Sequence, residues 1–418
     1  MSNPFVEGQA VFGSQYCGRE ELQEAVLSGC RRVWSVLGLR RFGKTSFLHQ
    51  LRHTCQARKL PFQPHFWDLH SLTTFDEYAA ALADPLHDDP ALAARTGLSR
   101  AELRRLSGSG DVLELLQVLL NTARQSECAL LLLIDEAESL VLLARDRPRE
   151  FAALRRFLLN RDGVVTVITG SRFLAELDDT AAPVGSAASS GFTPFHWLPP
   201  LPATSIRHWA QPHLPHLCEE DWENLCRRTH GHPYFIQALC SRLHASRGPV
   251  NEACDALLRG EGLVESRHGP EAFGHDYAYL TPLEQRLLQA LLRGGTLPAP
   301  LPQTELSASA DIVEPLLGGL VRSCYVRDDP EGYSLGNDFF AHWLRTQTAQ
   351  KLAQAKSLVS ESALQQVTAR SAPGDGLWEA GQLTGEGFDR LHRALLRAFP
   401  ARISRFRESF GFGLRNPL

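Results

Sequence analysis

Apolar and polar residues alternate in two different periods through the first two hundred positions of the chain. Five short segments are typical of buried strands: 33–37, 64–69, 130–134, 164–168 and 195–198. Three stretches between them repeat apolar residues at the spacing of an amphipathic helix: 44–59, 111–124 and 149–159. Apolar strands that alternate with helices predict a parallel sheet with helices on both faces. We therefore expect an α/β domain over residues 1–200.

Helical patterns replace the strands after residue 200. Residues 205–244 read as helices with turns at Pro212 and Gly231, and they predict an all-α lid over 201–275. Three further helices are then expected at 282–292, 303–307 and 311–320, followed by a hairpin over 324–335 around Asp-Asp-Pro-Glu-Gly. Three helices followed by a hairpin are typical of a winged helix, which we place at 276–347.

The remaining segments are more polar. Residues 178–191 are small and polar, which indicates a loop before the last strand of the sheet. A helical linker is expected over 348–382, because a polar helical stretch at 351–370 leads into Ser-Ala-Pro-Gly-Asp-Gly. Residues 383–418 predict the start of a small C-terminal helical domain.

Composition restricts the class of protein. The 418 residues are 43% hydrophobic and 22% charged, an ordinary globular balance, and the net charge of −4 gives no argument for nucleic acid as the main partner. No apolar run is long enough to span a membrane, and the N-terminus lacks a secretory signal. The nine cysteines are scattered without C-x-x-C spacing. We therefore expect a cytoplasmic protein with reduced thiols.

One segment carries a phosphate-binding signature. Residues 38–45, Gly-Leu-Arg-Arg-Phe-Gly-Lys-Thr, fit G-x-x-x-x-G-K-[ST] between a predicted strand and a predicted helix. Glycines let the backbone wrap around phosphate, and the helix N-terminus favours an anion. The alternative is a loop that matches by chance. The candidate nucleotide-binding residues are Gly38, Arg40, Arg41, Phe42, Gly43, Lys44, Thr45 and Ser46, with Lys44 also a catalytic candidate.

An acidic pair ends the apolar strand at 130–134. We assign Asp135, together with the Thr45 hydroxyl, to Mg²⁺, and Glu136 to the base that activates the attacking water. The alternative is an acidic pair that only stabilises the start of a helix.

A third polar cluster follows the strand at 164–168. Thr169-Gly170-Ser171-Arg172 places Arg172 where a guanidinium could contact the γ-phosphate. The alternative is a surface arginine that caps the edge of the sheet.

Together these motifs resemble the STAND class of P-loop ATPases, which are signal-transducing relatives of AAA+ proteins. The resemblance covers residues 3–345 and includes Arg-Arg-x-Gly-Lys-Thr-Ser at 40–46 and a G-x-P motif within 229–235. It also includes an N-terminal linker and the end of a winged helix at 337–345. It implies that Phe5, Arg19, His232 and Pro233 lie near the nucleotide. The alternative for the G-x-P segment is a simple break between helices, and Phe339, Phe340 and Trp343 read as core residues.

The C-terminal segment carries its own resemblance. Residues 383–400 and 411–414 are similar to the opening of a bacterial effector-associated domain, a small death-fold-like adaptor. The alternative is an ordinary amphipathic helix. More helices are expected than the segment up to Leu418 provides, so the resemblance is partial or the sequence is truncated.

The resemblance implies a switch that binds ATP or ADP with Mg²⁺ and hydrolyses ATP slowly or conditionally. On activation it would open or self-associate and recruit an effector protein through its C-terminal segment, in bacterial conflict or antiphage signalling. One alternative is an origin-recognition-like DNA-binding ATPase, which is disfavoured because 311–320 contains no Lys or Arg. Another is an adaptor that holds ADP without hydrolysing ATP.

Overall fold

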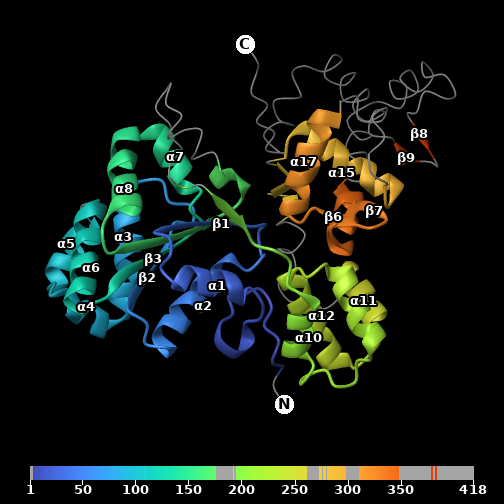
Figure 1. Cartoon of the computed structure of the whole chain (residues 1–418), viewed down its shortest axis with the longest axis horizontal. Coiled ribbons are helices and arrows are strands. Elements are labelled where there is room, and N and C mark those ends of the chain that lie inside the picture. Colours follow the sequence, from blue (N-terminus) through green and yellow to red (C-terminus); the bar gives the residue numbers. More distant parts are fainter. Residues whose placement is uncertain are drawn as a thin grey trace, which may run out of the picture. The chain divides into compact units, whose positions relative to one another are not determined.

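The computed structural model describes residues 3–108, 110–175, 192, 194–260, 273–274, 276–278, 280–297, 310–347, 378–379 and 382–383. The chain divides into two compact units, residues 1–265 and 266–418, and each is described by itself (Figure 1). Within the described residues, no helix is both long enough and apolar enough to cross a membrane.

A five-stranded parallel sheet forms the centre of the first unit, in the order β2-β3-β4-β1-β5. Its strands are β1 (Val33–Leu37), β2 (Phe62–Asp68), β3 (Ala129–Asp135), β4 (Val164–Gly170) and β5 (Phe195–Trp197). All five strands expected from the sequence are therefore confirmed. Because the strands are parallel, the carboxyl ends of β1, β3 and β4 meet at one edge of the sheet, and the motifs follow these ends.

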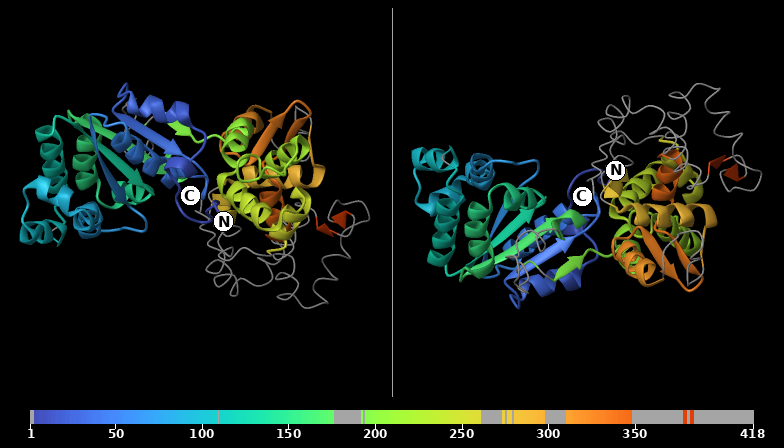
Figure 2. Two further views of the ribbon diagram at one scale, coloured as in Figure 1. Left: turned by 90° about the horizontal axis from the view of Figure 1, so that it is seen from below. Right: turned by 90° about the horizontal axis from the view of Figure 1, so that it is seen from above.

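Helices cover both faces of the sheet, as predicted (Figure 2). On one face, Leu130, Leu132 and Ile134 of β3 share a core with five helices: α3 (Phe75–Asp88), α5 (Arg100–Gly108), α6 (Val112–Gln125), α7 (Ser139–Asp146) and α8 (Pro148–Asn160). On the other face, α2 (Lys44–Ala57) packs on β2, β3 and β4, and α1 (Glu20–Leu27) packs on α2. The strand residues alternate between the two faces, which buries both sides of β3.

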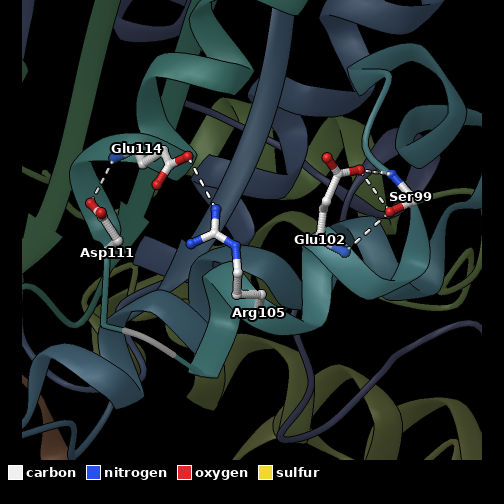
Figure 3. Close-up of polar contacts among 5 residues, drawn as sticks. All are labelled: Ser99, Glu102, Arg105, Asp111 and Glu114. Atoms are coloured by element: carbon white, nitrogen blue, oxygen red, sulfur yellow. Dashed lines mark hydrogen bonds and ion pairs between the residues drawn. The ribbon is translucent and has the colours of Figure 1, made fainter.

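The connection between β2 and β3 is a helical insertion that the sequence pattern did not predict in full. It contains α3, α4 (Pro90–Thr96), α5 and α6, and only α6 was expected. Capping fixes the later helices. Ser99 and Glu102 bond reciprocally at the start of α5, and Asp111 accepts the N–H of Glu114 at the start of α6 (Figure 3). Arg105 then bridges to Glu114 at 3.3 Å and joins the two helices.

A second group of helices follows β5 within the first unit. These are α10 (Ala203–Ala210), α11 (Glu219–Thr229), α12 (Pro233–Ser246) and α13 (Val250–Leu258). They lie in the segment that the sequence predicts to be a lid, and we refer to them as the helical lid. The helical character of 205–244 is thereby confirmed. Helix α11 ends where His230 and Gly231 adopt positive φ angles of 46° and 65°, and Pro233 is the first residue of α12.

The second unit contains helices and a hairpin. Its regular elements are α15 (Pro282–Gly294), α17 (Ala310–Arg322), a helix over 338–347, β6 (Val326–Asp329), β7 (Gly332–Leu335), β8 (Trp378–Glu379) and β9 (Gln382–Leu383). The hairpin β6–β7 is confirmed. Phe339, Phe340 and Trp343 are buried, so their interpretation as core residues is confirmed too. The loop expected at 178–191, the helix at 303–307, and nearly all of 348–418 lie outside the described residues.

Candidate functional site

The phosphate loop joins β1 to α2. Gly43 has a φ of 83°, a left-handed backbone conformation that favours glycine, and a Cβ atom there would lie 2.8 Å from Nη1 of Arg19. Lys44 begins α2 and is only 5% exposed, and its Nζ donates to the carbonyls of Gly38 and Leu39, both at 3.1 Å. The ammonium group is therefore held against the loop in which the sequence predicts phosphate.

The acidic strand meets this loop at Asp135. Its Oδ2 accepts a hydrogen bond of 2.6 Å from Oγ1 of Thr45. Its Oδ1 accepts the hydroxyl of Thr169 at the end of β4 and the backbone N–H of Glu136, the latter at 3.1 Å. Asp135 is buried, so these bonds replace the water it would otherwise hold. One carboxylate thus links α2, β3 and β4 at the carboxyl edge of the sheet.

The pair Thr45 and Asp135 fits the donor set of a magnesium site. Hydroxyl and carboxylate oxygens are hard ligands, and Mg²⁺ commonly takes one or two from the protein and the rest from phosphates and water. Across the described ranges, no group of three or more His, Cys, Asp or Glu side chains is placed to hold a metal ion. The two residues therefore suit an ion that arrives with a nucleotide better than one enclosed by protein alone.

Glu136 follows Asp135 in a left-handed backbone conformation, with a φ of 48°. This angle is uncommon for a residue other than glycine and marks a constrained turn. Burial raises the pKa of its carboxyl group above the ordinary value, while the charge of Lys44 acts in the opposite direction and that of Glu138 adds to the rise. A carboxylate with a raised pKa is a better proton acceptor, which is the chemistry required of a general base.

A second glutamate in the same turn was not singled out from the sequence. One oxygen of Glu138 accepts the backbone N–H of Ser171, and the other is buried with no hydrogen-bond partner among the described residues. Ser171 precedes Arg172, which begins the short helix η2 (Arg172–Ala175). Glu138 therefore ties the turn after β3 to the segment that carries Arg172. The repeated carboxylate in Asp-Glu-Ala-Glu was the available signal.

The G-x-P motif of the lid, Gly231 to Pro233, lies directly against the phosphate loop. Cγ of Pro233 is 3.8 Å from the position that a Cβ on Gly43 would occupy. The ring of His232 packs edge-on against Phe42, with centroids 5.0 Å apart. His232 is only 2% exposed, and its burial, reinforced by the charge of Arg19, lowers its pKa to about 3. The imidazole at this contact is thus neutral at ordinary pH.

The N-terminal segment contacts both the loop and the lid. Arg19 donates through Nη2 to the carbonyl of Phe42 at 2.7 Å. Ser46 accepts the backbone N–H of Val11 at 3.1 Å. Phe5, in contrast, is buried against the lid, with its ring 5.2 Å from that of Trp209. The structure therefore brings Arg19 to the phosphate loop and packs Phe5 on α10.

The other loop residues predicted to bind nucleotide have different neighbours in the structure. The side chain of Arg41 lies over the ring of Tyr234 in the lid, 4.7 Å from its centroid. The positive charge of Arg40 acts to lower the pKa of Glu136, against the larger effect of burial. The backbone N–H of Gly38 donates to Gly170 at the end of β4, at 3.1 Å.

Comparison with known proteins identifies the fold. No family model matches the sequence, and no curated protein matches it. The structure is similar to that of a Walker-type ATPase of Pyrococcus abyssi, with a TM-score of 0.57, 16% identity, and coverage of 80% of this chain and 98% of that one. This likeness, together with the strand order and the loop geometry, shows that the first unit has the α/β fold of a P-loop NTPase.

Two other solved structures are more distant. The ORC2 protein of Aeropyrum pernix, solved with ADPNP and ADP, has a TM-score of 0.46 and 13% identity over 84% of this chain and 98% of its own. A STAND protein with a tetratricopeptide repeat sensor from Pyrococcus horikoshii has a TM-score of 0.34 and 14% identity over 98% of this chain and 54% of its own. Scores below 0.5 do not decide between these two classes.

Proposed function

We propose that this chain is a Mg²⁺-dependent, ATP- and ADP-binding switch ATPase of the signal-transducing type. The observation that carries the proposal is the hydrogen bond between Thr45 and Asp135, with Lys44 and Glu136 beside it. It joins the two halves of a nucleotide site that lie far apart in the sequence. The alternative of a chance match to the loop motif would not require an acidic strand to end against it.

The residues have distinct roles in this proposal. Lys44 and the loop backbone bind the β- and γ-phosphates, and Thr45 and Asp135 hold the ion. The bound ion supplies neutralisation of the phosphate charge. Glu136 orients the attacking water and accepts its proton, and Arg172 contacts the γ-phosphate. Arg19 in the N-terminal segment and His232 and Pro233 in the lid border the nucleotide, while Phe5 packs the N-terminal segment on α10.

The wider mechanism is a change of state. Nucleotide held between the sheet and the lid favours one arrangement of the lid only to the extent that it binds that arrangement more tightly. The segment 276–347 acts as a winged helix, and 383–418 recruits an effector protein once the switch opens or self-associates. Conflict or antiphage signalling in bacteria is the setting implied by the resemblance to STAND proteins.

DNA binding is the second candidate, and the charges on α17 and at the tip of the β6–β7 hairpin do not favour it. Helix α17 contains Asp311 and Glu314 and has its one arginine, Arg322, at its end. The tip of the β6–β7 hairpin adds Asp328, Asp329 and Glu331, with all three side chains exposed. A surface that binds phosphates needs cations. A salt-dependent shift of duplex DNA by the purified chain would revive this candidate.

The proposed chemistry is tested with Glu136→Gln in the full chain. Glutamine keeps the size of the side chain but cannot accept the proton, so ATP turnover should fall by about 100-fold or more while MgATP binding is retained. Steady-state phosphate release and calorimetric binding measure the two quantities. Equal turnover in the variant would contradict the role of Glu136. Bound nucleotide without turnover in the wild type would favour an adaptor that holds ADP.

A further inference from the structure

Two side chains of the phosphate loop, Arg41 and Phe42, contact the lid. The guanidinium of Arg41 lies over the ring of Tyr234, with 4.7 Å between the guanidinium carbon and the ring centroid. Phe42 packs edge-on against His232, with centroids 5.0 Å apart, and both rings are buried. The variable positions of the loop motif therefore meet the residues that flank Pro233.

The backbone of the loop is set for this contact. Arg41 adopts a φ of 60° and Gly43 a φ of 83°, and the N–H of Phe42 donates to the carbonyl of Leu39 at 3.2 Å. A left-handed conformation is unfavourable at a residue other than glycine, whereas a cation held over an aromatic ring is stabilising. The contact with Tyr234 thus acts against the strain at Arg41.

Arg19 fixes the same contact from the other side. Its Nη2 donates to the carbonyl of Phe42 at 2.7 Å and to that of Pro199, at the entrance to the lid, at 3.3 Å. Two residues further along, the N–H of Leu201 donates to the carbonyl of Gly231 in the G-x-P motif at 2.9 Å. Hydrogen bonds therefore connect the phosphate loop, the segment 199–201 and the G-x-P motif, in addition to the aromatic contacts.

From this geometry we infer that Arg41 and Phe42 are positioning residues that couple phosphate binding to lid closure. Their backbone belongs to the phosphate loop, and their side chains hold the lid through Tyr234 and His232. Because coupling between two sites is reciprocal, filling the loop must change how firmly the lid is held, and loosening the lid must weaken nucleotide binding. The inference rests on the proposed nucleotide site and adds the means by which its occupancy reaches the lid.

A double-mutant cycle tests the coupling in the full chain. Tyr234→Leu removes the ring, Arg41→Gln removes the cation, and Tyr234→Phe keeps the ring as a matched control. Calorimetry with MgADP should show about fivefold weaker binding for each of the first two variants and nearly unchanged binding for the control. The double variant should be no weaker than either single one. Multiplied losses in the double variant, or an equal loss in Tyr234→Phe, would overturn the inference.

A second measurement does not depend on nucleotide. Hydrogen exchange of the α12 amides in nucleotide-free protein should be faster in Tyr234→Leu than in the wild type and unchanged in Tyr234→Phe. Unaltered protection in Tyr234→Leu would contradict the contact itself. If no protein, including the wild type, bound MgADP, the proposed function would fail while the exchange result still decided whether Arg41 and Tyr234 hold the lid.

Discussion

His232 shows how burial sets the chemistry of a single residue in the lid. Its ring is enclosed between Phe42 and Phe235, and desolvation, followed by the charges of Arg19 and nearby cationic groups, lowers its pKa to about 3. In the unfolded chain the same group titrates near 6.5. A depressed pKa means that its contribution to stability is complete above about pH 6.5 and is lost as pH falls toward the folded value.

Replacing His232 by Asn should flatten the acid side of the stability profile. Asparagine cannot titrate in this range and is a favourable residue at the start of α12. Between pH 7 and pH 5 the wild type should lose about 2 kcal/mol of unfolding free energy more than the variant. Urea denaturation at the two pH values measures the difference. His65 is also buried, with its pKa lowered to about 4, but it is present in both proteins and cancels. Identical pH slopes would show that His232 is not the titrating group.

The carboxylates at the sheet edge show which features of the site can be predicted from a local sequence pattern. Asp135 and Glu136 could be predicted because an acidic pair that ends an apolar strand is a local pattern. The hydrogen bonds from Thr45 and Thr169 to Asp135 could not, since they depend on the order of strands in the sheet. Glu138 was missed for the same reason, because its partner Ser171 follows a different strand.

At the scale of elements, the turn between α11 and α12 places a glycine against the backbone of a neighbouring segment. Gly231 has a φ of 65°, and a Cβ atom there would lie 2.5 Å from the carbonyl oxygen of Leu201 and 2.8 Å from its nitrogen. Both atoms belong to the backbone, so neither can move aside as a flexible side chain would. The backbone of Leu201, which precedes the lid, therefore packs directly against Gly231.

Gly231→Ala should destabilise the first unit more than a glycine replacement that meets no neighbour. Gly97→Ala is the matched control, because Gly97 has a similar φ of 72° and nothing within 4 Å of the added Cβ. The backbone strain is common to both variants, while the clash is present only in the first. We expect an additional loss of about 1–3 kcal/mol for Gly231→Ala, measured by denaturant unfolding. Equal losses would show that the approach of Leu201 does not constrain the turn.

Elements with a clear pattern of apolar residues could be predicted from the sequence, and elements with a weak pattern could not. The strands β1, β3 and β4 are mostly apolar, and the sequence pattern places each end within two residues of its position in the structure. Helix α5 buries mainly Leu103 and Leu106 among charged neighbours, so its period was too weak to predict a helix. Helix α3 contains Pro85, a residue that argues against a helix interior. Its capping box and its burial against the sheet outweigh that penalty.

At the scale of the whole molecule, the candidate chemistry is contained in the first unit. The phosphate loop, the acidic strand and the helical lid all lie within residues 1–265, whereas the hairpin and the acidic α17 belong to the second. The contact between Arg41 and Tyr234 could not be predicted, because no local pattern joins a loop near the start of the chain to a helix after the sheet. The motifs on both sides of that contact could be.

The central claim is that the first unit binds a nucleotide through Lys44, and direct analysis of the purified full chain tests it. The protein is denatured, any released nucleotide is identified by chromatography, and binding of added MgATP is measured in parallel, with Lys44→Ala as the control. We predict about one nucleotide per wild-type chain, carried or taken up, and none in Lys44→Ala, because the loop loses its only ammonium group. A wild-type protein that carries no nucleotide and binds no added MgATP would contradict the account.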